Sequence, residues 1–261
     1  MGVFVGAKKR ANYEATFFQQ INRWILAQSN SSWDFPENIQ YTNKHFEMQI
    51  QDAITRRIES YKRLEYLGLG STLKYKNFSE IDFIWGWKDP VNTITLPIWK
   101  NMFPNAKIIN IVRNPIDVAA SLKYREDKKQ SSFQLTPKKR YREWILDRRW
   151  IYNQSYYVMD IKNGVELWKK YVMMNEKHLA KNDSGSLSLV YEKLLANPAT
   201  YLNNLAQFLG IELNKSVIDK IATNINSSNR FKFLNDAELV DFYKSICNDS
   251  LLVKYGYHNL A

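Results

Sequence analysis

The sequence predicts an α/β fold in which helices cover a parallel sheet. Branched or long apolar side chains are frequent in two segments, Ile108–Val112 and residues 186–191. This composition is typical of parallel strands that are buried on both faces. Residues 81–87 form a third strand candidate, which is rich in aromatic side chains. Stretches long enough for helices lie between these segments, and this alternation is typical of parallel strands joined by crossover helices.

The chain has enough apolar residues for the core of one domain. Of its 261 residues, 45% are hydrophobic and 14% are aromatic, so we expect a single domain over residues 1–261. Residues 126–150 look like a basic insertion in that domain, because Lys and Arg clusters bracket a polar loop. A helix inside this insertion is expected to start at Thr136 and Pro137.

The charge and the cysteine count narrow the possible function classes. With 37 basic and 26 acidic residues the net charge is +11, which favours a polyanionic partner such as a nucleic acid, anionic lipid, acidic glycan or nucleotide. Cys247 is the single cysteine, and His45, His178 and His258 follow no ligand spacing, so we expect neither a disulfide within the chain nor a metal. We find no bilayer-spanning apolar run and no signal peptide, and therefore expect a cytoplasmic protein.

A basic residue follows the first of the buried strands and precedes a helix. Arg113 comes directly after Val112, Asn114 can cap the next helix, and Pro115 suits its first position. Ligands of α/β sheets bind outside the carboxyl ends of the strands, so Arg113 is placed to meet an anion, and Ser121 could serve the same anion. Alternatively, Arg113 forms an ion pair at the sheet edge and Ser121 is an ordinary helix residue.

The motif Arg-Asn-Pro-x-Asp-x-x-x-Ser at residues 113–121 resembles a segment of the sulfotransferases. In that family the matching Arg and Ser bind the 3'-phosphate of the donor, 3'-phosphoadenosine 5'-phosphosulfate. The resemblance therefore implies that Arg113 and Ser121 bind this phosphate. It also makes the donor nucleotide the expected co-substrate.

Two further segments resemble sulfotransferases. Val-Tyr-Glu-x-Leu at residues 190–194, followed by Asn-Pro and Phe-Leu-Gly, is similar to the C-terminal element of the family. The matching Tyr lines the adenine site, which implies that role for Tyr191, with packing as the alternative. Arg230 lies in the region where relatives bring another basic residue to the 3'-phosphate, although its local motif is poor.

An acidic residue near the N-terminus is the candidate general base. Residues 12–26 have an apolar stripe at helical spacing, so we expect a helix with Asn12 as N-cap and Glu14 in the first turn. A carboxylate there can simply complement the helix dipole. The pattern Glu14-x-x-Phe17-Phe18 is also similar to a segment of glycan-modifying sulfotransferases, whose Glu is the general base. The resemblance implies that Glu14 takes the acceptor proton.

Trp-Gly-Trp-Lys-Asp-Pro at residues 85–90 ends the aromatic strand candidate. It resembles the corresponding strand end of bacterial-type sulfotransferases, where the Lys lies near the transferring sulfonate, so Lys88 is implied as a catalytic residue. Lys88 could instead pair with Asp89 or with an exposed acid. A helix-sized crossover joins the strands that end at Lys88 and Arg113, and we expect both residues at the same edge of a parallel sheet.

The resemblance implies a P-loop-like, three-layer parallel sheet with helical additions. It also implies transfer of a sulfuryl group to a hydroxyl, and the Glu base points to a carbohydrate acceptor. The family normally opens with a strand and a Gly-x-x-Arg-Ser-Gly-Thr loop, which we do not find, so we expect a sheet without its first strand and phosphate loop. The alternatives are a non-catalytic relative that keeps the 3'-phosphoadenosine pocket, or a basic nucleic-acid-binding protein, although no nucleic-acid motif supports the latter.

Overall fold

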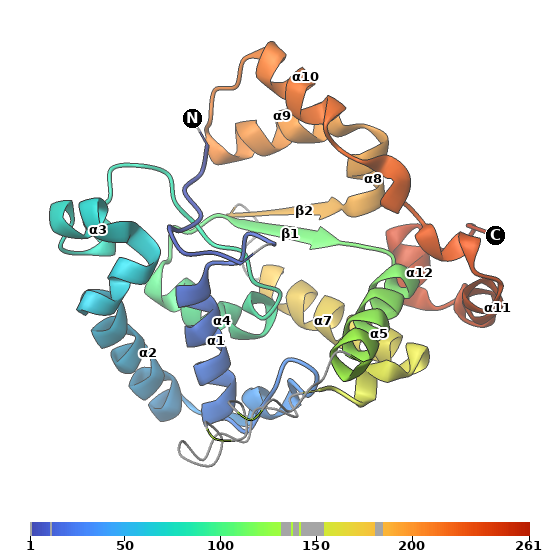
Figure 1. The fold of residues 1–261 in the computed structure, drawn as a ribbon, viewed down its shortest axis with the longest axis horizontal. Coiled ribbons are helices and arrows are strands. Elements are labelled where there is room, and N and C mark those ends of the chain that lie inside the picture. Colours follow the sequence, from blue (N-terminus) through green and yellow to red (C-terminus); the bar gives the residue numbers. More distant parts are fainter. Residues whose placement is uncertain (1, 11, 132–136, 138–140, 142–153, 181–184) are drawn as a thin grey trace. The chain divides into compact units, whose positions relative to one another are not determined.

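The computed structural model describes residues 2–10, 12–131, 137, 141, 154–180 and 185–261 (Figure 1). The chain divides into two compact units, Met1–Ala106 and Lys107–Ala261. The single-domain organisation stays a prediction. Of the helix expected to start at Thr136 and Pro137, the structure describes only Pro137 and Tyr141, which are both helical, and the rest lies outside the described residues.

The first unit is helical, with an aromatic core. Its helices are α1 (Thr16–Gln28), α2 (Lys44–Glu59), α3 (Leu64–Lys74) and α4 (Asn92–Met102), with short 3₁₀ turns at Glu37–Tyr41, Tyr61–Arg63 and Phe78–Glu80. Phe18 of α1 is fully buried, and its ring stacks on Trp87 with centroids 4.0 Å apart. Trp99 of α4 meets the same Phe18 ring edge-on at 5.5 Å. Stacked and edge-to-face rings of this kind stabilise a core beyond the area that they bury.

The expected aromatic strand over residues 81–87 is wrong in extent. Trp85 forms only an isolated parallel bridge with Phe4, fixed by hydrogen bonds of the Phe4 backbone with Ile84 and Gly86. Trp85 and Trp87 of this segment are partly buried and pack against the core of the unit, which accounts for these aromatic residues without a longer strand.

The start of α1 also differs from the expectation. An antiparallel bridge between Lys9 and Ala15 closes a tight turn, and Ala15 rather than Asn12 is the N-cap. Tyr13 in this turn has a left-handed backbone with φ of +61°, an uncommon conformation for a bulky residue. Glu14 therefore precedes the helix and does not lie in its first turn, because the bridge takes up the backbone groups around it.

The second unit is an α/β unit. Its strands β1 (Ile108–Val112) and β2 (Ser186–Val190) pair in parallel, with Ile108 opposite Ser186 and Val112 opposite Val190. Its helices are α5 (Pro115–Ser131), α7 (Ile161–Leu179), α8 (Tyr191–Ala196), α9 (Pro198–Leu209), α10 (Lys215–Thr223), α11 (Ala237–Ile246) and α12 (Ser250–Tyr255), with 3₁₀ turns at Tyr157–Met159, Ser227–Asn229 and Lys232–Asn235. Both strands lie where their apolar runs predict them. The expected burial of both faces is wrong for β1, because Ile109 and Ile111 are 40% and 55% exposed. The α/β class is confirmed, and the P-loop-like, three-layer arrangement stays a prediction.

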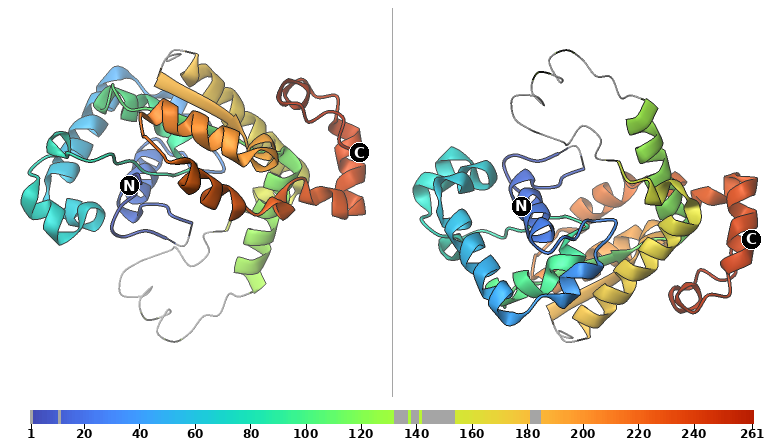
Figure 2. Two further views of the ribbon diagram at one scale, coloured as in Figure 1. Left: turned by 90° about the horizontal axis from the view of Figure 1, so that it is seen from above. Right: turned by 90° about the horizontal axis from the view of Figure 1, so that it is seen from below.

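Helices α5 and α7 pack closely, and both Figures 1 and 2 show them against each other. The approach depends on Gly164 of α7, where an added Cβ would lie 2.8 Å from the Cβ of the fully buried Ala119 and 3.1 Å from its Cα. Glycine is needed here because a larger residue would push against the backbone of α5.

In the described residues, no helix is both long enough and apolar enough to cross a membrane.

We expect Gly164→Ala to lower the free energy of unfolding by about 1 kcal/mol. Overpacking a core contact typically costs about 1–3 kcal/mol, and the better helix propensity of Ala returns at most about 1 kcal/mol. Urea unfolding measures the difference. Gly70 of α3 is the matched control, because an added Cβ there meets nothing within 4 Å, so Gly70→Ala should be neutral or stabilising. A Gly164→Ala protein as stable as the wild type would contradict the close approach.

Candidate functional site

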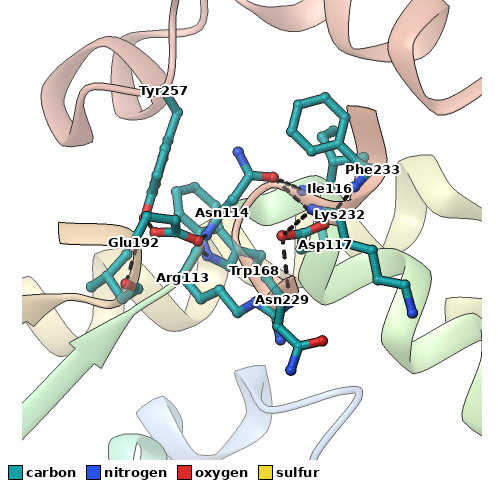
Figure 3. A network of polar contacts seen from close by, with 11 residues as sticks. Arg113, Asn114, Ile116, Asp117, Trp168, Glu192, Asn229, Lys232, Phe233 and Tyr257 are labelled. Atoms are coloured by element: carbon teal, nitrogen blue, oxygen red, sulfur yellow. Dashed lines mark hydrogen bonds and ion pairs between the residues drawn. The ribbon is translucent and has the colours of Figure 1, made fainter. Parts of the chain in front are cut away.

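The turn between β1 and α5 has the capping geometry that the sequence predicts. The Asn114 side-chain oxygen accepts hydrogen bonds from the backbone N–H groups of Ile116 (3.0 Å) and Asp117 (3.2 Å), and Pro115 is the first residue of α5 (Figure 3). These bonds satisfy backbone donors that a helix start leaves unpaired. Arg113 is consequently held at the carboxyl end of β1.

The Arg113 side chain is surrounded by groups from three segments. One of its Nη atoms donates to the carbonyl of Asn229 at 3.1 Å and lies 3.4 Å from Asp117. The guanidinium carbon is 5.0 Å from the centroid of the Tyr191 ring, within cation–π range. The Nε atom is buried and has no hydrogen-bond partner in the described part of the chain. Arg113 thus forms the ion pair that the alternative interpretation required, yet it keeps a donor that no described residue uses.

Asp117 fixes the loop that faces Arg113. Its buried carboxylate accepts hydrogen bonds from the backbone N–H groups of Phe233 at 2.9 Å and Lys232 at 3.3 Å. Between Asn229 and these residues, Phe231 has a left-handed backbone with φ of +49°. A bulky residue in this conformation is costly and persists where the surroundings hold it. Asp117 supplies part of that support.

Besides Arg113, three residues are predicted from the sequence to bind the nucleotide: Tyr191, Arg230 and Ser121. Tyr191 is the first residue of α8, directly after β2, and the structure brings its ring to Arg113. Arg230 belongs to the loop that contacts Arg113 through Asn229, but its own guanidinium is exposed and lies over the Phe231 ring at 5.2 Å. Ser121 lies on α5 with an exposed side chain. The roles of these three residues and of Arg113 in binding a nucleotide stay predictions.

The two predicted catalytic residues lie together in the first unit. Glu14 is buried, accepts a 2.6 Å hydrogen bond from the Gln19 amide, and lies 3.8 Å from the ammonium of Lys88. Lys88 is 58% exposed at its side chain and also donates to the carbonyl of Asn12 at 3.1 Å. Among the described residues, the ion-pair partner of Lys88 is therefore the buried Glu14, and not Asp89 or an exposed acid.

A buried amide orders the segment that carries Lys88. Asn22 of α1 is fully buried and donates to the carboxylate of Asp89 at 2.9 Å and to Asn92 at 2.8 Å. Its own oxygen accepts from Thr95 at 2.9 Å and from the Trp99 indole at 2.7 Å. Burial raises the pKa of Asp89 above its ordinary value, although the Asn22 hydrogen bond opposes this. The sequence gives no sign of this role for Asn22, because one polar residue on an apolar helix face carries no motif.

No group of three or more His, Cys, Asp or Glu side chains comes close enough together to hold a metal ion within the described ranges.

The comparisons with known proteins identify the family. The model of the Sulfotransferase family matches residues 6–215, which is most of the chain. The chain belongs to the sulfotransferase family. It is similar to a 3-beta-hydroxysteroid sulfotransferase of Cavia porcellus, with 28% identity over 169 residues. This alignment covers 62% of the chain and 51% of the relative, so the chain spans about half the length of the curated relative it matches. A search of the solved structures finds no match.

The family match divides the candidate residues into two groups. Glu14, Lys88, Arg113, Ser121 and Tyr191 lie within the matched residues 6–215, and Arg230 lies beyond them. The sequence interpretation also missed residues that hold the Arg113 turn in place: Trp168, Glu192, Asn229 and Tyr257. Only Glu192 carried a signal, since it stands in the Tyr-Glu-x-Leu motif. The others contact the turn only through the tertiary fold.

Proposed function

We propose that this sulfotransferase moves a sulfuryl group from 3'-phosphoadenosine 5'-phosphosulfate to a hydroxyl of a carbohydrate. The observation that carries the proposal is the Arg113 turn inside the family-matched segment. There a guanidinium stands at the carboxyl end of a parallel strand, within cation–π range of the Tyr191 ring, with one buried donor that no described residue uses. Such a group is suited to an anionic ligand, because Arg pairs well with phosphate oxygens.

Arg113 and Ser121 would bind the 3'-phosphate of the donor, and Tyr191 would contact its adenine. Arg230 would add positive charge from the loop after α10. These roles suit the net charge of +11 and the contact between the Arg113 guanidinium and the Tyr191 ring. When bound, the donor supplies the sulfuryl group and leaves as adenosine 3',5'-bisphosphate.

Glu14 and Lys88 would serve the transfer. Glu14 would accept the proton that the acceptor hydroxyl loses as its oxygen bonds to sulfur, and Lys88 would offset negative charge on the sulfonate oxygens. The 3.8 Å separation of the two charged groups supports this assignment, since it brings a base and a cation to one place. A carbohydrate is the proposed acceptor because the Glu14 segment resembles that of glycan-modifying enzymes.

The test is a transfer assay with the sulfonate of the donor labelled. Neutral and acidic oligosaccharides form one set of acceptors, and a 3β-hydroxysteroid forms the comparison set, because the similar protein of Cavia porcellus is named for such an acceptor. We expect label on a carbohydrate hydroxyl. Label on the steroid alone would contradict the proposed acceptor class. Tight binding of the nucleotide with no transfer to any acceptor would favour the non-catalytic alternative.

A further inference from the structure

The peptide group between Arg113 and Asn114 is held on both of its sides. Its carbonyl oxygen accepts a 2.9 Å hydrogen bond from the indole N–H of Trp168, and its N–H donates to a Glu192 oxygen at 2.9 Å (Figure 3). A peptide group is planar, so two bonds on opposite sides fix its orientation. That orientation sets the direction in which the Arg113 side chain leaves the backbone.

Glu192 is itself held by the C-terminal segment. Its carboxylate is buried at 2% exposure, and its second oxygen accepts a 2.6 Å hydrogen bond from the hydroxyl of Tyr257. In the described residues, no Lys, Arg or His forms an ion pair with it. A buried carboxylate without a cation depends on its hydrogen-bond donors, which are the Asn114 N–H and the Tyr257 hydroxyl.

The Tyr257 hydroxyl is suited to remain a donor. The residue is 1% exposed, and burial together with the neighbouring Glu192 carboxylate raises the pKa of Tyr257. The hydroxyl also lies 3.5 Å from the carbonyl oxygen of Val112, the last residue of β1. Tyr257 stands outside the residues that match the family model, so the family match assigns it nothing.

We propose that Tyr257 is a positioning residue for the anion site. It holds Glu192, Glu192 holds the Arg113–Asn114 peptide, and the peptide aims the Arg113 guanidinium at the 3'-phosphate. This inference rests on the proposed function, since it takes the ligand of Arg113 to be that phosphate.

The test compares two nucleotides that differ only in the 3'-phosphate. Calorimetry gives the affinities of the full chain for adenosine 3',5'-bisphosphate and for adenosine 5'-phosphate. The readout is the ratio of the affinity for the bisphosphate to the affinity for the 5'-phosphate. A variant that merely unfolds in part weakens both affinities by the same factor and leaves the ratio unchanged. We expect Tyr257→Phe to lower the ratio about three- to tenfold, as the loss of one buried hydrogen bond implies.

Tyr243→Phe is the matched control. Tyr243 is equally buried in the same core, but its hydroxyl accepts from the backbone N–H of Leu260. Its substitution should leave the ratio within twofold of the wild type. An unchanged ratio in Tyr257→Phe, or an equal fall in Tyr243→Phe, would overturn the inference.

A second variant shows whether Tyr257 acts through Glu192, and it also serves if Tyr257→Phe does not fold. Glu192→Ala should lower the ratio at least as much, and adding Tyr257→Phe to it should cost nothing more. Additive losses would overturn the inference. If the wild type itself does not distinguish the two nucleotides, the proposed phosphate site fails and the inference fails with it. If the wild type does distinguish the two nucleotides but Tyr257→Phe leaves the ratio unchanged, the inference fails and the proposed phosphate site is retained.

Discussion

Glu14→Gln should lower kcat for sulfuryl transfer by about 10²–10⁴-fold, because the amide has the size of the carboxylate but cannot take a proton. The buried carboxylate lies 3.8 Å from Lys88, and the amide can still accept the hydrogen bond from Gln19. The affinity for the nucleotide should therefore hardly change. A steady-state transfer assay of the full-length protein with the labelled donor measures kcat, and calorimetry measures the affinity for the nucleotide.

The alternative role for Glu14 predicts a different result. If the carboxylate only interacts with the dipole of the following helix, its loss should cost at most about 1 kcal/mol of stability and leave kcat unchanged. Glu47 is the matched control, since it stands in the first turn of α2. Glu47→Gln should have the small effect on stability and no effect on kcat. Transfer at the wild-type rate by Glu14→Gln would remove Glu14 as the base and direct attention to Asp89, the buried acid that follows Lys88.

Arg113→Ala should weaken the binding of adenosine 3',5'-bisphosphate about tenfold or more. Removing one partner of a charge-assisted hydrogen bond typically costs about 1.5–3 kcal/mol, and Arg113 also lies within cation–π range of Tyr191. Ser121→Ala should cost less, because a hydroxyl offers a single neutral donor. Calorimetric titration of each variant measures the loss. Adenosine 5'-phosphate should bind the wild type poorly and respond little to Arg113→Ala.

Two controls accompany the Arg113 variant. Arg56→Ala removes an exposed guanidinium that pairs with Asp52 on α2, and it should leave the affinity for the bisphosphate unchanged. Arg113→Lys keeps the charge but loses the planar fork, so its affinity should lie between those of the wild type and Arg113→Ala. Equal affinities in the wild type and Arg113→Ala would show that the 3'-phosphate binds elsewhere.

Features of the fold with a local cause could be predicted from the sequence. The strand Ile108–Val112 and the Asn114 cap follow from neighbouring residues, since an apolar run and a capping side chain act within a few positions. The start of α1 could not be predicted in this way. Its boundary is set by the bridge between Lys9 and Ala15, so the nearby Asn12 does not cap the helix and Glu14 lies outside it.

The same distinction between local and distant causes applies to the candidate site. Motifs identified Glu14, Lys88 and Arg113 one at a time, but the 3.8 Å contact between the first two depends on how α1 and the segment before α4 pack. The residues that hold these groups are harder still to find, because Asn22 and Tyr257 act through buried hydrogen bonds to partners far along the chain. Their roles follow from the folded structure alone.

A crystal structure of the protein with adenosine 3',5'-bisphosphate tests the central claim most directly. We predict that the 3'-phosphate lies within hydrogen-bond distance of the Arg113 guanidinium, with Tyr191 beside the adenine and the Arg113–Asn114 peptide still bonded to Trp168 and Glu192. A bisphosphate bound with its 3'-phosphate away from Arg113, while the guanidinium remains on Asp117 and Asn229, would contradict the account.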